Sequence, residues 1–130
     1  MKRKILCFVL IYALVCTMSI TAFAGSAYDD GYTNSITGGG VLYCQAYLDV
    51  DSSRAYATTT NDQDFISWCT TVATIYYLDD NGDEVPETDQ GKGSVSVYGM
   101  PTKGVRGGSY HLVSGGSTYG AWSCSLYANK

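Results

Sequence analysis

Short segments rich in β-branched and aromatic residues, separated by turn signals, recur along this chain and constrain its fold more than any other feature. The segment 41–50 alternates strictly between apolar and polar positions, which is typical of a half-buried strand. The segment 68–78 (WCTTVATIYYL) is dominated by β-branched and aromatic residues, which favour strands. Asn81-Gly82 follows it and predicts a hairpin turn, because asparagine and glycine tolerate positive φ. No amphipathic helix of useful length is present in the sequence.

The remaining expected strands are short and are separated by polar or glycine-rich stretches. They are 54–60, a run that starts at Val85 and that Pro86 ends or confines to an edge, 94–100, 109–114 and 118–128. The residues 88–92 and 101–108 are predicted as loops, with the glycines of the second stretch as turn residues. About seven short antiparallel strands predict an all-β fold. The expected architecture is a small antiparallel β-sandwich, immunoglobulin-like or jelly-roll-like, with a small barrel as the alternative.

The first 24 residues have the three parts of a secretory signal peptide. Lys2-Arg3-Lys4 makes a basic start, an apolar run extends to Cys16, and Ala22-Phe23-Ala24 supplies a small-x-small cleavage site. The apolar run is shorter than the about 20 residues that a membrane-spanning helix needs. We therefore expect cleavage after Ala24, secretion from a bacterial cell, and no membrane association of the mature protein. The expected organisation is a signal peptide (1–24), an irregular Gly/Ser/Asp-rich lead-in (25–40) and one β-sandwich domain (41–130).

The charge of the expected mature chain is strongly acidic. All twelve acidic residues lie beyond Ala24, whereas three of the eight basic residues belong to the signal peptide. Such a chain repels nucleic-acid phosphates and anionic lipid surfaces. The composition therefore excludes nucleic-acid binding.

Three cysteines lie beyond the expected cleavage site: Cys44, Cys69 and Cys124. Cys44 and Cys124 each follow a glycine-rich turn and occupy the apolar row of an expected strand, so they are the preferred disulfide pair. In the chain-entropy model this link would contribute about 2–4 kcal/mol. The alternative is that all three are buried thiols that pack as small hydrophobes. An unpaired cysteine also leaves a covalent dimer open.

Two features suggest chemistry, and both have a simpler structural explanation. Asp79, Asn81 and Asp83 resemble the start of a calcium loop, but Gly82 comes too early, and a hairpin turn is preferred. His111 is the only histidine, and no nucleophile signature accompanies it, so it is interpreted as a structural strand residue. Three scattered cysteines and one histidine do not suggest a zinc site, which needs about four ligands. We expect no catalytic residue, no metal and no cofactor.

Tyrosine is the residue type that these interpretations leave unexplained. Of the twelve tyrosines, all but Tyr12 lie beyond the expected cleavage site. Tyr43, Gln45 and Tyr47 share the outward row of the first expected strand, and Tyr56 is expected to face outward on the next one. Flat rings rimmed by hydrogen-bonding groups suit sugars and extended peptides. Tyrosine is also an ordinary strand residue that pairs across a sheet, so a purely structural role is the alternative.

A second row of outward tyrosines is expected on the later strands, at Tyr110, Tyr119 and Tyr127. The hypothesis from sequence is a small secreted, non-enzymatic binding module. It would act extracellularly or at the cell surface, with a carbohydrate or a protein as its ligand. The alternatives are a diffusible secreted effector, antibacterial or signalling, and a structural subunit of the cell envelope.

Overall fold

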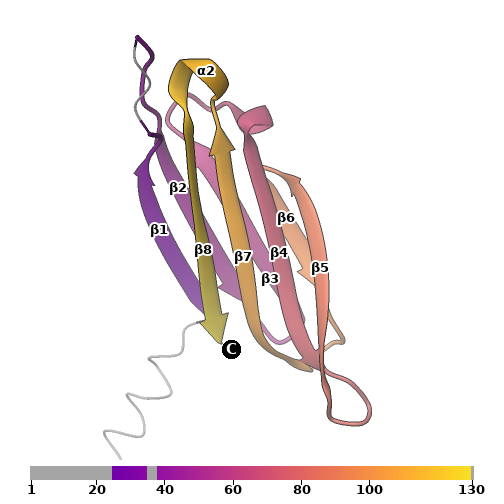
Figure 1. The fold of residues 1–130 in the computed structure, drawn as a ribbon. Coiled ribbons are helices and arrows are strands. Elements are labelled where there is room, and N and C mark those ends of the chain that lie inside the picture. Colours follow the sequence, from indigo (N-terminus) through magenta and orange to yellow (C-terminus); the bar gives the residue numbers. More distant parts are fainter. Residues whose placement is uncertain (1–24, 35–37, 130) are drawn as a thin grey trace, which may run out of the picture.

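The chain forms two antiparallel four-stranded sheets that pack face to face (Figure 1). The computed structural model describes residues 25–34 and 38–129, so the expected signal peptide and its cleavage site after Ala24 lie outside the described residues. Sheet A has the strand order β1-β2-β3-β6, and sheet B has the order β5-β4-β7-β8. The prediction of a small all-β sandwich is confirmed.

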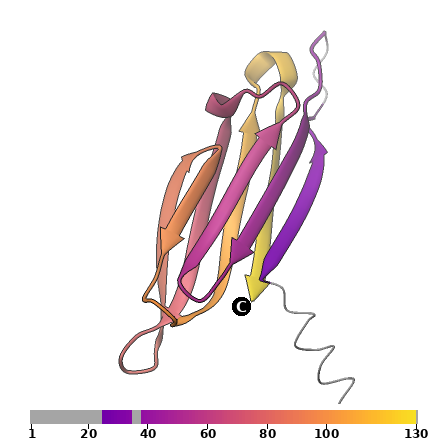
Figure 2. The ribbon, with the colours of Figure 1, turned by 180° about the vertical axis from the view of Figure 1, so that it is seen from behind.

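Eight strands and two short helical turns make up the described chain. Sheet A consists of β1 (Ser26–Tyr32), β2 (Tyr43–Val50), β3 (Arg54–Asn61) and β6 (Ser94–Tyr98). Sheet B consists of β4 (Cys69–Leu78), β5 (Glu84–Lys92), β7 (Gly104–Ser114) and β8 (Ala121–Asn129). The turns η1 (Ile66–Trp68) and α2 (Gly116–Tyr119) lie at the same end of the sandwich (Figure 2). Within the described ranges, no helix is long and apolar enough to cross a membrane.

The core lies between the sheets and divides into two clusters. The alternation predicted for 41–50 is confirmed, because Cys44, Ala46, Leu48 and Val50 are all buried. A main cluster holds most of the buried apolar residues: Ala46, Leu48, Val50, Ala55, Ala57, Ala73, Ile75, Val95, Val97, Leu126 and Ala128. A small cluster contains Leu42, Cys44, Cys69 and Val113. Trp122 contacts both clusters and joins them.

The predicted Cys44–Cys124 disulfide is absent, because all three cysteines of the described chain are free thiols. Cys44 lies with Cys69 in the small cluster, whereas Cys124 packs against the main cluster. Burial raises the pKa of Cys44 to about 11 and also raises the pKa of Cys69, which keeps both thiols neutral. The prediction was wrong because alternation determines which side of a sheet a residue faces, but not its neighbour across the interior.

The first strand, β1, corrects the prediction that 25–40 is a mostly irregular lead-in. Ser26–Tyr32 pairs with β2 along its whole length. Aspartate and glycine are poor strand formers, so the local propensity of this segment is low. Pairing with the strongly patterned β2 overrides that propensity.

Three further boundaries differ from the sequence-based expectation. β7 begins at Gly104, so the glycines predicted as turn residues belong to a strand. β5 continues through Pro86 and through 88–92, which was predicted as a loop. Pro86 was predicted either to end this strand or to confine it to the edge of a sheet, and the second alternative is confirmed. β5 is an edge strand that pairs only with β4, so the missing N–H group of the proline interrupts no hydrogen bonds to a second neighbour. The last strand starts at Ala121 instead of Thr118, since α2 precedes it.

Close packing explains why one of these strand positions is glycine. A Cβ atom at Gly107 would lie 2.6 Å from Val50 Cγ2 and 3.1 Å from the Thr74 carbonyl oxygen. Gly107→Ala is therefore expected to lower the free energy of unfolding by about 1–3 kcal/mol. Gly108→Ala is the matched control, because a Cβ atom there would lie at an ordinary 3.4 Å from the Tyr127 ring. Urea unfolding should show a loss for the first variant only, and equal losses would contradict the packing argument.

Candidate binding surface

The outer face of sheet A is formed by the outward positions of its four strands. Strand pairing places Tyr28 beside Tyr47, and Tyr47 beside Thr58. The same alternation extends over the sheet and gives one continuous surface, which we call the tyrosine face. It consists of Ser26, Tyr28, Asp30, Tyr32, Tyr43, Gln45, Tyr47, Asp49, Arg54, Tyr56, Thr58, Thr60, Ser94, Ser96 and Tyr98. The four residues singled out from sequence, Tyr43, Gln45, Tyr47 and Tyr56, all belong to it.

Hydrogen bonds orient the rings at one end of the tyrosine face. The hydroxyls of Tyr28 and Tyr43 both donate to Asp30 Oδ2, at 3.0 Å and 2.5 Å. The Gln45 amide in turn donates to the Tyr28 hydroxyl at 2.9 Å. The rings of Tyr32 and Tyr43 lie 5.2 Å apart, centroid to centroid. The exposed rings are thus held in defined positions before any ligand arrives.

The electrostatics of this network keep Asp30 ionised. The hydrogen bond from Tyr43, followed by that from Tyr28, lowers the pKa of the Asp30 carboxyl. The same bond to Asp30 raises the pKa of Tyr43 well above its usual range. The Asp30 carboxylate therefore accepts from both hydroxyls, and its hydrogen bond with Tyr43 is stable over a wide pH range.

The β3–β6 side of the tyrosine face carries a cation, two tyrosines and a hollow. The Arg54 guanidinium lies 5.5 Å from the Tyr56 ring centroid. Beside Tyr56 the surface is hollowed, with a volume of about 340 Å³. The hollow is lined by Tyr56, Thr58, Thr59, Thr60, Ile66, Lys92, Gly93 and Ser94. Tyr98 lies opposite Arg54 in the register of β3 and β6 and is 65 % exposed.

Besides Tyr98 of β6, the residues of this surface that sequence reasoning missed include Tyr28, Asp30 and Tyr32. All three lie on β1, in the segment predicted to be irregular. Their spacing of two residues was the available signal, since strand side chains alternate with that period. It was obscured by Asp29 and Gly31, which lie between them and are poor strand formers. Asp30 accepts the hydrogen bonds that orient Tyr28 and Tyr43. Because β1 was not predicted as a strand, this hydrogen-bond network was not predicted either.

The expected second row of tyrosines is only partly formed. Tyr110 and Tyr127 occupy outward positions of sheet B. Tyr119 instead belongs to α2, and its ring centroid lies 5.7 Å from that of Trp68 beside the small cluster. A third tyrosine that was not singled out, Tyr76 of β4, faces outward on sheet B.

His111 lies in the interior, inside a chain of hydrogen bonds that joins the two sheets. Thr59 of sheet A lies 2.8 Å from His111 Nδ1 and 2.6 Å from the Thr71 hydroxyl. Ser109 Oγ lies 2.6 Å from His111 Nε2, and the Thr71 hydroxyl donates to the Gly93 carbonyl at 2.8 Å. Burial lowers the pKa of His111 to about 4. Both ring nitrogens are occupied, and the histidine acts as a polar link between the sheets.

The Asp79–Asp83 segment forms the hairpin turn that its sequence predicts. The Asp79 carboxylate accepts the backbone N–H groups of Asn81 and Asp83, both at 2.9 Å, and Gly82 has φ of 83°. The carboxylate that resembled a calcium ligand is thus engaged by the turn itself. Across residues 25–34 and 38–129, no group of three or more His, Cys, Asp or Glu side chains is arranged to hold a metal ion.

Comparisons with models of known protein families, with curated proteins and with solved structures gave no match.

Proposed function

We propose that this chain is a secreted carbohydrate-binding module that holds a polysaccharide on the tyrosine face. The observation that carries the proposal is the preordered set of rings around Asp30. Binding usually costs side-chain entropy, and rings that are already held by hydrogen bonds lose little of it. Exposed tyrosines offer apolar area and a hydroxyl together, and both are needed to bind a sugar ring and fix its orientation.

The composition of the tyrosine face favours a sugar over a protein ligand. Its fifteen strand positions, as defined above, hold six tyrosines together with serine, threonine, glutamine, aspartate and arginine, and none is aliphatic. Protein interfaces are enriched in tyrosine and arginine, as this face is, but their buried centre is usually more apolar and is depleted in aspartate and serine. A surface of rings, hydroxyls, two carboxylates and one guanidinium instead matches a ligand that carries many hydroxyl groups.

The test is binding of the purified mature protein to insoluble polysaccharides and bacterial cell walls. Tyr43→Ala combined with Tyr47→Ala is expected to weaken retention at least about tenfold, as loss of two aromatic anchors does at other interfaces. Met100→Ala is the control, because it removes an exposed apolar side chain from a loop outside the tyrosine face. The urea midpoint of each variant should stay close to that of the unmodified protein.

Two results would contradict the proposal. One is retention by the double variant equal to that of the unmodified protein. The other is failure of the unmodified protein to bind any of the polysaccharides or cell walls. The second result would favour a diffusible effector, for which addition of the pure protein to target cells is the measurement.

A further inference from the structure

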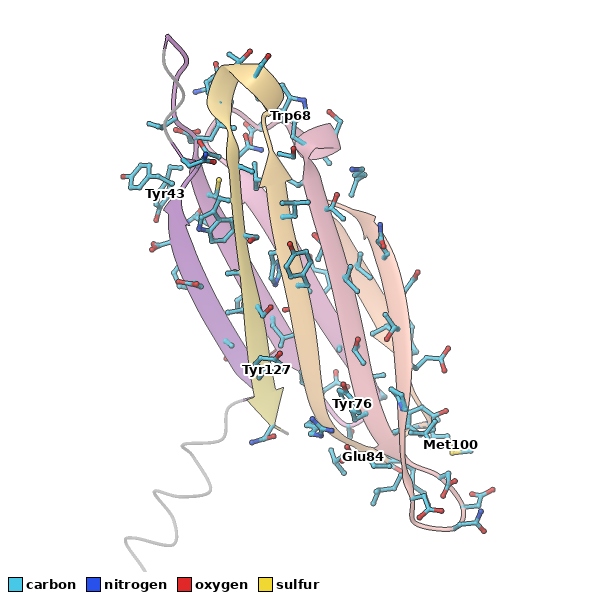
Figure 3. The ribbon with its side chains drawn as sticks, viewed as in Figure 1. Tyr43, Trp68, Tyr76, Glu84, Met100 and Tyr127 are labelled. Carbon is cyan, nitrogen blue, oxygen red and sulfur yellow. The ribbon has the colours of Figure 1, made fainter. Side chains whose placement is uncertain are left out.

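The outer face of sheet B is hollowed over a glycine in the middle of β7. Gly108 occupies an outward position and is flanked by Thr74 of β4 and Tyr127 of β8. The hollow has a volume of about 170 Å³. Its lining comes from three adjacent strands: Val72, Thr74, Tyr76, Gly108, Ser109, Tyr110, Ser125 and Tyr127. Figure 3 shows Tyr76 and Tyr127 toward the same end of sheet B, away from Trp68.

Three tyrosines form the walls of this hollow. Register places Tyr76 and Tyr110 on the two sides of the Gly108 row, and Tyr127 directly across from Gly108. The Arg106 guanidinium lies 3.8 Å from the Tyr76 ring centroid and pairs with Glu84. These contacts hold the Tyr76 ring and neutralise the nearest charges. The lining residues themselves carry no charged side chain.

Packing alone does not account for this arrangement. A ring laid over a strand glycine is a known way to cover it, and the Tyr127 ring lies 3.4 Å from where a Cβ atom of residue 108 would be. Tyr127 is nevertheless 75 % exposed and Tyr110 is 43 % exposed, so both rings keep a face open to a ligand. Glycine within a strand also weakens it and often marks a place where a ligand approaches the backbone closely. An alanine fits at Gly108 without a clash, so packing does not require glycine there.

We infer that the Gly108 hollow is a second sugar site that takes one ring of a neutral, equatorially substituted pyranose chain. Such a ring exposes its axial C–H bonds as a flat apolar surface, which complements tyrosine rings. Its equatorial hydroxyls can reach the hydroxyls of Thr74 and Ser125 at the rim, and Thr74 is held by a 2.8 Å hydrogen bond with Thr88. The uncharged lining favours a neutral ligand, since a charged one would lose hydration without gaining a partner.

The Gly108 hollow and the tyrosine face lie on opposite outer faces of the sandwich. The second site therefore does not depend on the first. If both bind, one molecule can bridge two polysaccharide chains, and the gain in avidity needs no additional contact.

The test uses amide chemical shifts during titration with two soluble probes, cellotetraose and the tetrasaccharide of N-acetylglucosamine. With one of them, the amides of Gly108, Ser125 and Tyr127 are expected to shift. Gly108→Ala fills the floor of the hollow and should weaken this binding at least about tenfold while leaving stability unchanged. Tyr127→Ala should act in the same direction, and Tyr98→Ala, on the opposite sheet, should have no effect on these shifts.

Three outcomes overturn the inference. One is the absence of shifts around Gly108 with both probes, and another is binding by Gly108→Ala that equals that of the unmodified protein. The third is a set of shifts confined to Tyr47, Thr58 and their neighbours, which would support the tyrosine face alone. Shifts around Gly108 without any at sheet A would support the second site and count against the first, so the two proposals can fail separately.

Discussion

Lowering the pH from about 7.5 to about 5 is expected to reduce the free energy of unfolding by about 2 kcal/mol, through His111 alone. Burial lowers the pKa of His111 from 6.5 to about 4, and a hydrogen bond with the Thr58 backbone offsets only part of the shift. Below about pH 6.5 the unfolded chain binds a proton that the folded chain does not. The contribution of His111 to the free energy of unfolding is therefore fully present above about pH 6.5. It decreases as the pH falls further and stops changing below about pH 4.

The hydrogen bonds around His111 determine which ring nitrogen carries the proton in the neutral side chain. The Gly93 carbonyl can only accept, so the Thr71 hydroxyl donates to it. Thr59 must then donate to Thr71, and His111 Nδ1–H must donate to Thr59. Nε2 is left as the acceptor for the Ser109 hydroxyl. A second ring proton would force Ser109 to turn its hydroxyl and would place a charge in the interior, which is why protonation opposes folding.

Between about pH 7.5 and pH 5 the effect of His111 on stability is separated from that of the carboxyl groups, which titrate at lower pH. Hydrogen bonds lower the pKa values of Asp30, Asp51 and Glu84, the strongest coming from Tyr43, from the Ser53 backbone and from Arg106 respectively. Their contribution to stability is present above the ordinary carboxyl pKa and is lost only at lower pH. Since His111 is the only histidine, its ring proton signals can be followed directly by NMR. A His111 pKa near 6.5 in the folded protein, or equal stability at the two pH values, would refute the prediction.

Local pattern predicted the strands that carry strong alternation, and with them the facing of the key side chains. Strand side chains alternate with a period of two, so the sequence of β2 alone placed Tyr43 and Tyr47 outward and Cys44 inward. The hairpin turn at Asn81-Gly82 was also predicted, because the positive φ that such a turn needs is a property of its own residues. These features need no knowledge of the rest of the fold.

What the sequence did not predict depends on contacts between distant segments. β1 has low strand propensity and exists because β2 pairs with it, so the Asp30 network was not foreseen. Position 107 of β7 is glycine because Val50 and Thr74 of other strands leave no room for a side chain there. Thr59 and His111 are 52 residues apart and meet only once the two sheets pack. No local pattern distinguishes such a polar link from an ordinary polar residue on a strand.

Thr59→Val is expected to lower the free energy of unfolding by about 2–3 kcal/mol, because it removes the central member of this polar link. The valine methyl group cannot accept the Nδ1–H of His111 or donate to Thr71, and both partners are fully buried. The desolvated N–H group of the histidine is then left without an acceptor. Thr58→Val is the matched control: its side chain faces outward beside Tyr47, and a change within about 0.5 kcal/mol is expected.

A second substitution separates the loss of the hydrogen bond from a general disturbance of packing. Replacing both partners of a buried hydrogen bond by apolar groups removes the unsatisfied donor along with its acceptor. Thr59→Val combined with His111→Leu should therefore be more stable than the sum of the two single losses predicts, with a coupling of about 1–2 kcal/mol. Urea unfolding of the four proteins at about pH 7.5 measures this. Additive losses, or equal effects of Thr59→Val and Thr58→Val, would show that the two sheets are held by apolar packing and that the polar link contributes nothing of its own.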